Sequence, residues 1–531
     1  MVEGDGVIPA QQWVQGAADE AWFGTAALSS VKSSNPSPGQ GTPSSSFLDL
    51  PPVLITEIFK HLNARELSLV SCVCSLFRGL SSDSHGWKNF YFERWGNPVP
   101  GTSTVDDPAF SERSWRDLYV ARETRSKAFL GRYQTDMMNG HNNAVRCVRL
   151  LAPANLIFTA GYDSILRIWD LEECLPLSWS QPLGTTLRSI AVDMRMLVVG
   201  GTDAKIRMWK VITALKHRFD VGGACGSQIV HSGHEGPITS LSMDEVIICS
   251  GSWDMSVKLW DRNSLACIKT LIHRDWVWAI CLRGQSLVSS SGSDVYSWDV
   301  ETGRCLRVRA GTHHGQAYAV ECSRSGHFVF SGGEDGIIRM YEDKALRKKG
   351  SEGCVEFLQG LNNEPIAFWH PHLGAVHELA FEDPWLVSAS GDGALAMMDI
   401  RKIRKRSGDL GKPREYAKVN LPWTVVSTDA ESPQRMLFGS KQCFYSVDIG
   451  LDRIVSAGEK QVVKVWDFSH ALEIERRVQA SRMIRLERRF KRKQGLQLKT
   501  KQHEICGSVS KKDADAEGAV FWQGRGIKIK G

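Results

Sequence analysis

A repeated unit constrains the fold of this chain more strongly than any other feature of its 531 residues. The clearest copy, GHEGPITSLSMDEVIICSGSWDMSVKLWD, reads as a series of short β-strands and ends in Trp260 and Asp261. Recurrence at this period is typical of repeat architectures, in which each unit packs against its neighbours. Seven such units are present, and their last residues are Asp170, Lys210, Asp261, Asp299, Glu342, Asp399 and Asp467.

The units resemble WD repeats, whose four-stranded blades build a β-propeller. The resemblance rests on the closing Trp-Asp and on a His that precedes a loop Asp by 20 or 22 residues. In that family the two side chains hydrogen-bond and hold one blade loop against another. The resemblance therefore assigns these pairs a structural role and not that of a catalytic dyad. The pairs are His141 with Asp163, His234 with Asp254, His313 with Asp335 and His372 with Asp392.

The resemblance predicts an all-β propeller, and seven units favour seven blades that close without exposed sheet edges. The segment FLGRYQTDMM before the first unit is expected to supply the outer strand that closes the ring. Three units are degenerate. The second lacks the Gly-His start, the fourth has Asp294 only four residues before Trp298, and the seventh has Lys460 in place of the loop Asp. Residues 408–441 leave a divergent eighth blade open as the alternative.

The segment FLDLPPVLITEIFKHL has a helical period instead. Pro51 and Pro52 suit a helix start, where a missing N–H costs nothing. Leu54, Ile58 and Leu62 then recur every fourth residue, and ELSLVSCVCSLFRGL repeats an apolar face. Two helices of this size cannot bury these faces by themselves. They either cap the neighbouring domain or dock on another protein.

The helical segment resembles an F-box. The family's motifs are matched in order by Leu50-Pro51, Ile58-Phe59, Leu62, Glu66-Leu67, Val73-Cys74 and Trp87. Val53 departs from the family, where an acidic residue is common, but it leaves the apolar face intact. The resemblance implies a Skp-family adaptor as partner, and through it a cullin and a RING protein. The residues expected to contact the adaptor are Leu50, Pro51, Leu54, Ile58, Phe59 and Leu62.

The resemblance to F-box/WD proteins also implies a ring of side chains at the mouth of the propeller channel, one from the start of each inner strand. These are Arg146, Arg188, Thr239, Trp278, Tyr318, His377 and Tyr445. Tyr162 and Trp253, which precede loop aspartates, are expected on the same face. Trp, Tyr and Arg dominate interface hot spots, and the arginine fork suits phosphate or carboxylate. We therefore expect a substrate with an acidic or phosphorylated degron; the alternative is that some of these side chains only line a water-filled channel. The predicted substrate-binding residues are Arg146, Arg188, Trp253, Trp278, Tyr318, His377 and Tyr445.

Composition changes along the chain divide it into five parts. Residues 1–45 are too poor in large apolar side chains to repay the entropy of ordering. Residues 46–91 form the F-box, 92–131 a helical linker, 132–470 the propeller and 471–531 a basic tail. The run RRFKRK in this tail resembles a nuclear import signal. We favour import over a nucleic-acid patch because aromatic residues suited to base stacking are sparse there.

The remaining patterns exclude several classes of protein. The sequence has no apolar run long enough to span a membrane and no secretory signal, and its thirteen cysteines show no zinc-binding spacing. We expect a nuclear or cytoplasmic protein that needs no metal or other cofactor. It contains no recognisable catalytic motif, so the resemblances imply the non-catalytic substrate-recognition subunit of an SCF-type ubiquitin ligase. The alternative is a nuclear WD-repeat scaffold of an RNA–protein complex, with nucleic acid held through the basic tail.

Overall fold

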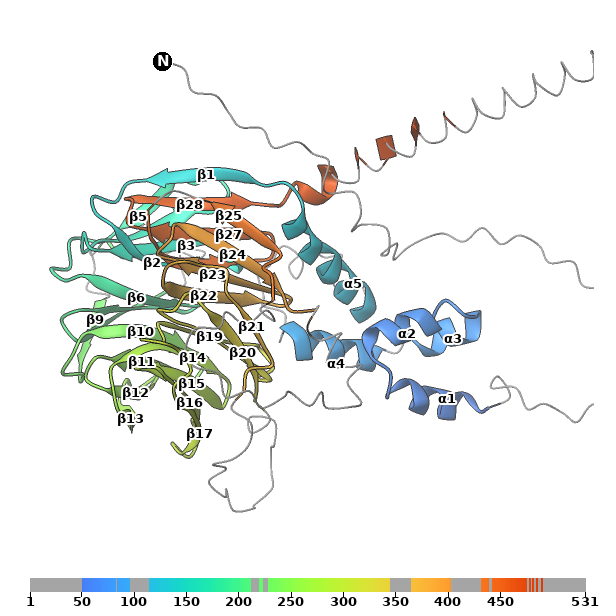
Figure 1. Ribbon diagram of the computed structural model, residues 1–531, viewed down its shortest axis with the longest axis horizontal. Helices are drawn as coiled ribbons and strands as arrows, with labels where there is room; N and C mark the ends of the chain where they lie inside the picture. The colour runs from blue at the N-terminus through green and yellow to red at the C-terminus, as the bar shows by residue number, and fades with distance from the viewer. Residues whose placement is uncertain are drawn as a thin grey trace, which may run out of the picture. The chain divides into compact units, whose positions relative to one another are not determined.

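The computed structural model describes most of the helical region and of the propeller (Figure 1). The described residues are 50–82, 84–95, 114–211, 219–222, 228–343, 364–401, 403, 431–438 and 442–474, with further positions up to 489. The predicted N-terminal tail and, apart from Arg489, the basic run at 488–493 lie outside them. Within the described parts, no helix is both long and apolar enough to cross a membrane. The chain consists of two compact units, residues 1–61 and 62–531, each with more contacts within itself than with the other.

Helix α1 (Pro52–Phe59) belongs to the first unit. Its first turn contains proline, as the sequence predicts. Ile55 and Phe59, one turn apart, are buried, whereas Leu54 and Ile58 on the neighbouring face are 51% and 42% exposed. Phe59 is only 6% exposed and lies on the buried side of the helix, and its contact with an adaptor stays a prediction.

The second unit begins with four helices, α2 (Ala64–Val70), α3 (Ser75–Leu80), α4 (Ser84–Trp95) and α5 (Trp115–Ser126). Helix α2 starts with a capping box, in which Asn63 and Glu66 satisfy each other's backbone N–H groups. Helices α4 and α5 share a small aromatic core around Tyr91, Trp95 and Leu118. Helix α4 continues past the predicted end of the F-box at residue 91, so F-box and linker share one helix.

Seven four-stranded antiparallel sheets follow, which confirms the propeller and its seven blades. Blade 1 is β2 (Val145–Leu151), β3 (Leu156–Gly161), β4 (Leu166–Asp170) and β5 (Pro176–Trp179); blade 2 is β6 (Leu187–Val192), β7 (Met196–Gly201), β8 (Lys205–Lys210) and β9 (Gln228–Ser232). Blade 3 is β10 (Ile238–Met243), β11 (Ile247–Ser252), β12 (Ser256–Asp261) and β13 (Cys267–Ile272); blade 4 is β14 (Val277–Arg283), β15 (Ser286–Ser291), β16 (Asp294–Asp299) and β17 (Cys305–Arg309). Blade 5 is β18 (Ala319–Cys322), β19 (Phe328–Gly332), β20 (Ile338–Glu342) and β21 (Ala367–Trp369); blade 6 is β22 (Val376–Glu382), β23 (Trp385–Ser390), β24 (Ala394–Asp399) and β25 (Arg435–Phe438). Blade 7 is β26 (Phe444–Ile449), β27 (Arg453–Gly458), β28 (Val462–Asp467) and β1 (Gln134–Asn139).

The ring closes as the sequence predicts. Strand β1, from the segment before the first repeat, pairs antiparallel with β28, from Gln134 opposite Asp467 to Asn139 opposite Val462. The first strands of neighbouring blades contact one another around the whole ring, and β26 of blade 7 contacts β2 of blade 1. The segment between β24 and β25 is an insertion within blade 6, so the alternative of an eighth blade finds no support among the described strands.

The four predicted His–Asp pairs all form, and each is part of a larger network. In blade 3, His234 Nδ1 lies 2.6 Å from an Asp254 oxygen, and its Nε2 lies 2.7 Å from Ser250 Oγ. The same Oγ accepts a 2.8 Å hydrogen bond from Trp260 Nε1. One buried chain of hydrogen bonds thus joins the loop Asp to the closing Trp, which explains why the repeat contains both residues.

The degenerate fourth blade keeps only part of this network. His273 bonds Ser289 Oγ at 2.8 Å, and Trp298 Nε1 donates to the same oxygen at 2.9 Å. The shortened turn provides no loop carboxylate to His273, and burial lowers the pKa of His273 to about 4. The imidazole is therefore neutral at pH 7 and serves as a hydrogen-bonded core residue.

The helical linker is bonded to blade 6. Arg94 Nη2 on α4 lies 2.7 Å from Asp383 Oδ1, and Trp95 Nε1 donates to the Asp383 carbonyl oxygen at 2.9 Å. Trp385 Nε1 donates at 2.7 Å to the Ser126 carbonyl at the end of α5. These contacts are buried, and the Arg94–Asp383 contact is also charge-assisted, so hydrogen bonds and an ion pair join α4 and α5 to the propeller.

Candidate functional site: the channel mouth

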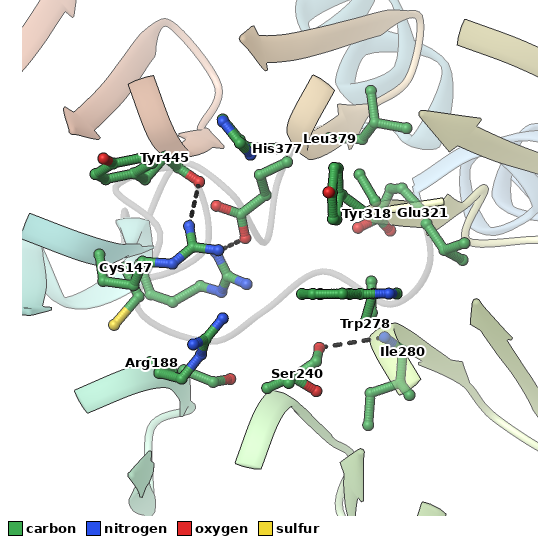
Figure 2. Close-up of a pocket in the computed structure, with 18 residues that line it drawn as sticks. Cys147, Arg188, Ser240, Trp278, Ile280, Tyr318, Glu321, His377, Leu379 and Tyr445 are labelled. Atoms are coloured by element: carbon green, nitrogen blue, oxygen red, sulfur yellow. Dashed lines mark hydrogen bonds and ion pairs between the residues drawn. The ribbon is translucent and has the colours of Figure 1, made fainter. Parts of the chain in front are cut away.

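The seven predicted ring residues come together around one cavity. The first strands of all seven blades line it, and its volume is about 80 Å³. Figure 2 shows five of these side chains, Arg188, Trp278, Tyr318, His377 and Tyr445, grouped around the cavity. Arg146 and Thr239 complete the ring. Trp253 does not line the cavity itself but contacts two residues that do, Arg188 and Trp278.

A β-bulge positions the ring side chain in six blades. In blade 1, Val145 pairs with Gly161 and Cys147 with Ala160, so Arg146 has no partner in the ladder. A bulge leaves its extra residue unpaired and re-aims the side chain. Gly161 permits the close backbone approach, because a Cβ there would lie 2.2 Å from the Ala144 carbonyl oxygen. The bulged residues of the other five blades are Arg188, Thr239, Trp278, His377 and Tyr445.

Aromatic rings form an unbroken arc along one side of the mouth. Trp278 meets Tyr318 edge to face at 4.8 Å between centroids, and Tyr318 lies 5.9 Å from the His377 ring. His377 then meets Tyr445 at 5.5 Å. On the other flank Trp278 contacts Trp253 at 5.6 Å. Aromatic pairs at these distances stabilise one another, so the arc is a pre-formed surface.

The two arginines lie at the two ends of this arc. The Arg146 guanidinium carbon is 5.1 Å from the Tyr445 ring centroid, and its Nη1 donates to the Tyr445 carbonyl at 3.2 Å. The Arg188 guanidinium carbon lies 4.5 Å above Trp253. Arg188 Nε and Trp253 Nε1 are buried and have no hydrogen-bond partner within the described structure. Burial, together with the positive charge of Arg146, lowers the pKa of Arg188 to about 10.

Arginines deeper in the channel have carboxylate partners instead. Arg149 Nη1 lies 2.6 Å from Glu378 Oε1, and Arg283 Nη2 lies 2.6 Å from Glu321 Oε1. No ion pair to a described carboxylate forms at Arg146 or Arg188. The mouth therefore carries two positive charges that no described carboxylate neutralises, whereas the arginines beneath it form ion pairs with glutamates.

Inner-strand backbone groups are also satisfied from the neighbouring blade. Ser446 Oγ accepts from Val148 N at 2.9 Å, and Ser240 Oγ accepts from Ile280 N at 3.2 Å (Figure 2). Asp448 accepts from Leu150 N at 2.8 Å, and burial raises the pKa of Asp448 to about 6. The polar groups of the deeper channel hold the blades together, which leaves the mouth as the part with free binding capacity.

Some exposed residues were not predicted as site residues. Trp276, in the turn before β14, is 45% exposed and stacks on Trp253. No repeat position marks it, although a Trp-x-Trp at the start of an inner strand is a signal that could have found it. Three apolar residues of α2, α3 and the turn between them are also exposed, Leu69, Val73 and Leu76. Their spacing of three or four residues is the sequence signal that indicates a shared helical face. Of the predicted adaptor residues, Leu50, Pro51, Leu54 and Ile58 are exposed and Leu62 is half-buried.

The arrangement of these side chains suits binding. The four predicted His–Asp pairs are used in blade networks, and no described cluster of His, Cys, Asp or Glu is arranged as metal ligands would be. The mouth offers two guanidiniums, an aromatic surface and a neutral imidazole. Such a set can bind an anion and an apolar group side by side.

The titration of His377 tests this description of the mouth. Burial and the nearby Arg146 charge lower the pKa of His377 to about 4, so the ring stays neutral down to about pH 5. Replacing Arg146 by Ala removes that positive charge and is expected to raise the pKa of His377. Carbon-detected NMR of labelled histidine measures both midpoints. Arg304→Ala, at an exposed position, is the control that leaves the midpoint unchanged. A midpoint near 6.5 in the unaltered protein contradicts the description.

Comparison with known proteins gives a consistent assignment. An F-box-like family model matches residues 47–93, and the model for the WD domain, G-beta repeat, matches residues 132–170, 226–261 and 303–342. The F-box/WD-40 repeat-containing protein At5g21040 of Arabidopsis thaliana is 48% identical over 455 residues, which cover 85% of this chain and 80% of that protein. Human F-box/WD repeat-containing protein 9 is 28% identical over 223 residues, which cover 40% of this chain and 38% of that protein. The WD40 propeller of Doa1 aligns with 63% of this chain and 97% of its own, at 16% identity and a TM-score of 0.48.

Proteins with this domain pair are typically non-catalytic receptors: the F-box implies a Skp-type adaptor as partner, and the propeller implies protein binding. The similarity to the Arabidopsis protein extends over both domains. The chain belongs to the F-box/WD-40 repeat-containing proteins.

Proposed function

We propose that this protein is the substrate-recognition subunit of an SCF-type ubiquitin ligase, and that the channel mouth binds an anionic segment of the substrate. The observation that carries the proposal is that Arg146 and Arg188, in adjacent blades around one cavity, form no ion pair with any carboxylate in the described part of the chain. They occur in a chain that also contains an F-box.

The adaptor half of the proposal rests on the exposed apolar side chains of α1. Leu54 and Ile58 expose 51% and 42% of their surface, and Val53 beside them exposes 77%. Burying a large apolar side chain contributes ~1.5–3 kcal/mol. A few such side chains exceed the cost of association, so an apolar groove on a Skp-family adaptor is a suitable partner.

The substrate half rests on electrostatics. Two guanidiniums that face one small cavity repel each other, and burial removes the water that would screen them. An anion between them removes the repulsion and accepts the unused N–H groups. One phosphoryl dianion, or carboxylates of acidic residues, would neutralise both charges. A substrate with a phosphorylated or acidic degron fits this requirement.

In this proposal the chain would accelerate ubiquitin transfer by holding the substrate close to the partner enzyme. The linker helices are bonded to blade 6, so a substrate held at the mouth keeps a fixed position relative to α4 and α5. Holding two reactants in one assembly replaces an encounter in solution and lowers the entropic barrier. In this proposal the reacting lysine and ubiquitin meet at a partner enzyme, and this chain contributes binding alone.

The adaptor half predicts that Leu54→Asp/Ile58→Asp abolishes co-purification of adaptor and cullin, because each change places a charge in an apolar interface. The matched control is Leu177→Asp/Ile268→Asp on outer strands of the propeller, where both side chains are 49% exposed. Quantitative mass spectrometry of the purified complexes measures the outcome. Undiminished adaptor and cullin in the α1 variant would overturn the assignment. Partners that are lost after RNase, with no cullin present, would favour the alternative of an RNA–protein scaffold.

The substrate half predicts that Arg146→Ala/Arg188→Ala lowers substrate capture from cells with a blocked proteasome. A hydrogen bond to a charged group contributes ~1.5–3 kcal/mol, so the loss of one arginine corresponds to about tenfold to a hundredfold weaker binding. Arg195→Ala/Arg304→Ala, at two exposed positions, is the control. Equal capture by the mouth variant and the control places the substrate site elsewhere. Phosphatase treatment of the lysate then separates the anions, since loss of capture indicates phosphate and unchanged capture indicates Asp or Glu.

A further inference from the structure

Trp276 extends the binding surface beyond the seven ring positions. Its ring stacks on Trp253, with centroids 5.3 Å apart and planes inclined by 29°. Trp278 meets it edge to face at 6.1 Å. We call these three residues the tryptophan ridge. Trp276 is its exposed end, with 45% of its surface open to solvent.

The blade networks do not explain the ridge. The indoles that close repeats, such as Trp260 and Trp298, are buried and donate to a blade serine. The backbone of Trp276 is instead held at the surface, where its amide N–H donates to Asp275 Oδ1 at 2.7 Å and its carbonyl accepts from Gly292 N at 3.3 Å, and its ring is stacked on Trp253. A large aromatic surface that is exposed and already ordered loses little entropy on binding, which is the usual character of an interface hot spot.

The ridge begins at the anion site. The Arg188 guanidinium lies 4.5 Å above Trp253, on whose ring Trp276 is stacked. A ligand whose anion reaches Arg188 therefore passes beside the ridge. The group next to the anion then meets an apolar, aromatic surface and not water.

Carboxylates also occur on loops next to the strands of several blades, and Arg274 and Lys460 stand beside two of them. Glu235 and Asp275 lie just before the inner strands of blades 3 and 4, and Glu334 and Glu459 lie just after the second strands of blades 5 and 7. Glu334 also accepts a 3.1 Å hydrogen bond from Gln316 N, two residues before Tyr318. A run of acidic residues or a nucleic-acid backbone would meet several of these carboxylates at once, so they disfavour it more than they disfavour one isolated anion.

We infer that the mouth selects a peptide segment with one isolated anionic residue beside a bulky apolar side chain, and that Trp276 determines specificity for the apolar side chain. This inference rests on the proposed function for the anion at Arg146 and Arg188. It adds the neighbouring apolar residue, and it excludes extended acidic runs and single-stranded RNA as preferred ligands.

The test uses the full chain purified with its adaptor and a set of fluorescent twelve-residue peptides. Each peptide has one phosphoserine or one Glu in a Gly-Ser background, with Leu, Phe or Ala placed one to three residues to either side. Two further probes are a peptide with four consecutive Glu residues and a twelve-nucleotide single-stranded RNA. Fluorescence anisotropy gives Kd for the unaltered chain and for Trp276→Ala. Trp179→Ala is the matched control, because Trp179 is 55% exposed on outer strand β5.

The expected result is a coupling between the protein residue and the peptide residue. Leu or Phe beside the anion should strengthen binding to the unaltered chain, and Trp276→Ala should weaken these peptides by about tenfold while the Ala peptides change little. Trp179→Ala should change neither. The thermal midpoint of Trp276→Ala should match that of the unaltered chain, since the residue lies at the surface.

Three outcomes overturn the inference. These are equal weakening of Leu and Ala peptides by Trp276→Ala, tighter binding of the four-Glu peptide or the RNA, and no measurable binding of any peptide. The first of these leaves the proposed function intact if the arginine variant still abolishes peptide binding. Conversely, the chain could fail to capture cullin while Trp276→Ala still weakens the Leu and Phe peptides selectively. This result would overturn the proposed role in a ubiquitin ligase and support the inference about Trp276.

Discussion

The pairing of β1 with β28 holds the rest of the structure in place. Blade 7 takes its outer strand from the segment before the first repeat and its other three strands from the last repeat. The ring therefore closes through hydrogen bonds between residues more than three hundred positions apart, such as Asn139 and Val462. Closure leaves no blade at an open end, and it brings the inner strand of blade 7 against that of blade 1. The Arg146–Tyr445 contact at the mouth exists only in the closed ring.

In the closed ring, the inner strands of the blades form the binding site. A bulge at the start of the strand turns one side chain per blade toward the channel, while serines and carboxylates further along satisfy the neighbouring strand. The deeper arginines are neutralised within the channel, as at Arg149 and Glu378. Among the described residues that line the cavity, Arg146 and Arg188 are the arginines that form no ion pair with a carboxylate. Burial makes this charge costly without a ligand, and an anion supplied by a partner removes that cost.

Much of this architecture could be predicted from the sequence, because it depends on local patterns. The His–Asp spacing located the four pairs, and the position of FLGRYQTDMM before the first repeat placed the closing strand. The ring residues were found by their fixed position in each repeat, which the structure explains through the bulge. What could not be predicted depends on contacts between distant residues. Sequence spacing does not show that Glu378 pairs with Arg149, whereas Arg146 forms no ion pair with a described carboxylate.

Other features that the sequence did not predict also depend on contacts between residues that are not related by the repeat pattern. Arg94 and Asp383, which join the linker to blade 6, are 289 positions apart. Trp276 lies outside the repeat pattern, so only its contact with Trp253 relates it to the mouth. Phe59 belongs to an apolar helix whose period shows which residues share a face, but the period does not show which of two adjacent faces is buried.

Photo-crosslinking from the mouth tests the central claim most directly. Thr239 lines the cavity and is part-buried, so a photo-reactive amino acid in its place would face a segment bound at the mouth. The chain is irradiated in cells with a blocked proteasome, and the crosslinked peptide is sequenced by mass spectrometry. The account predicts a peptide from a ubiquitin-conjugated protein, with a phosphorylated or acidic residue close to the crosslink, and loss of this product in Arg146→Ala/Arg188→Ala. Crosslinks to RNA, or to peptides without an anionic residue that persist in the arginine variant, would contradict it.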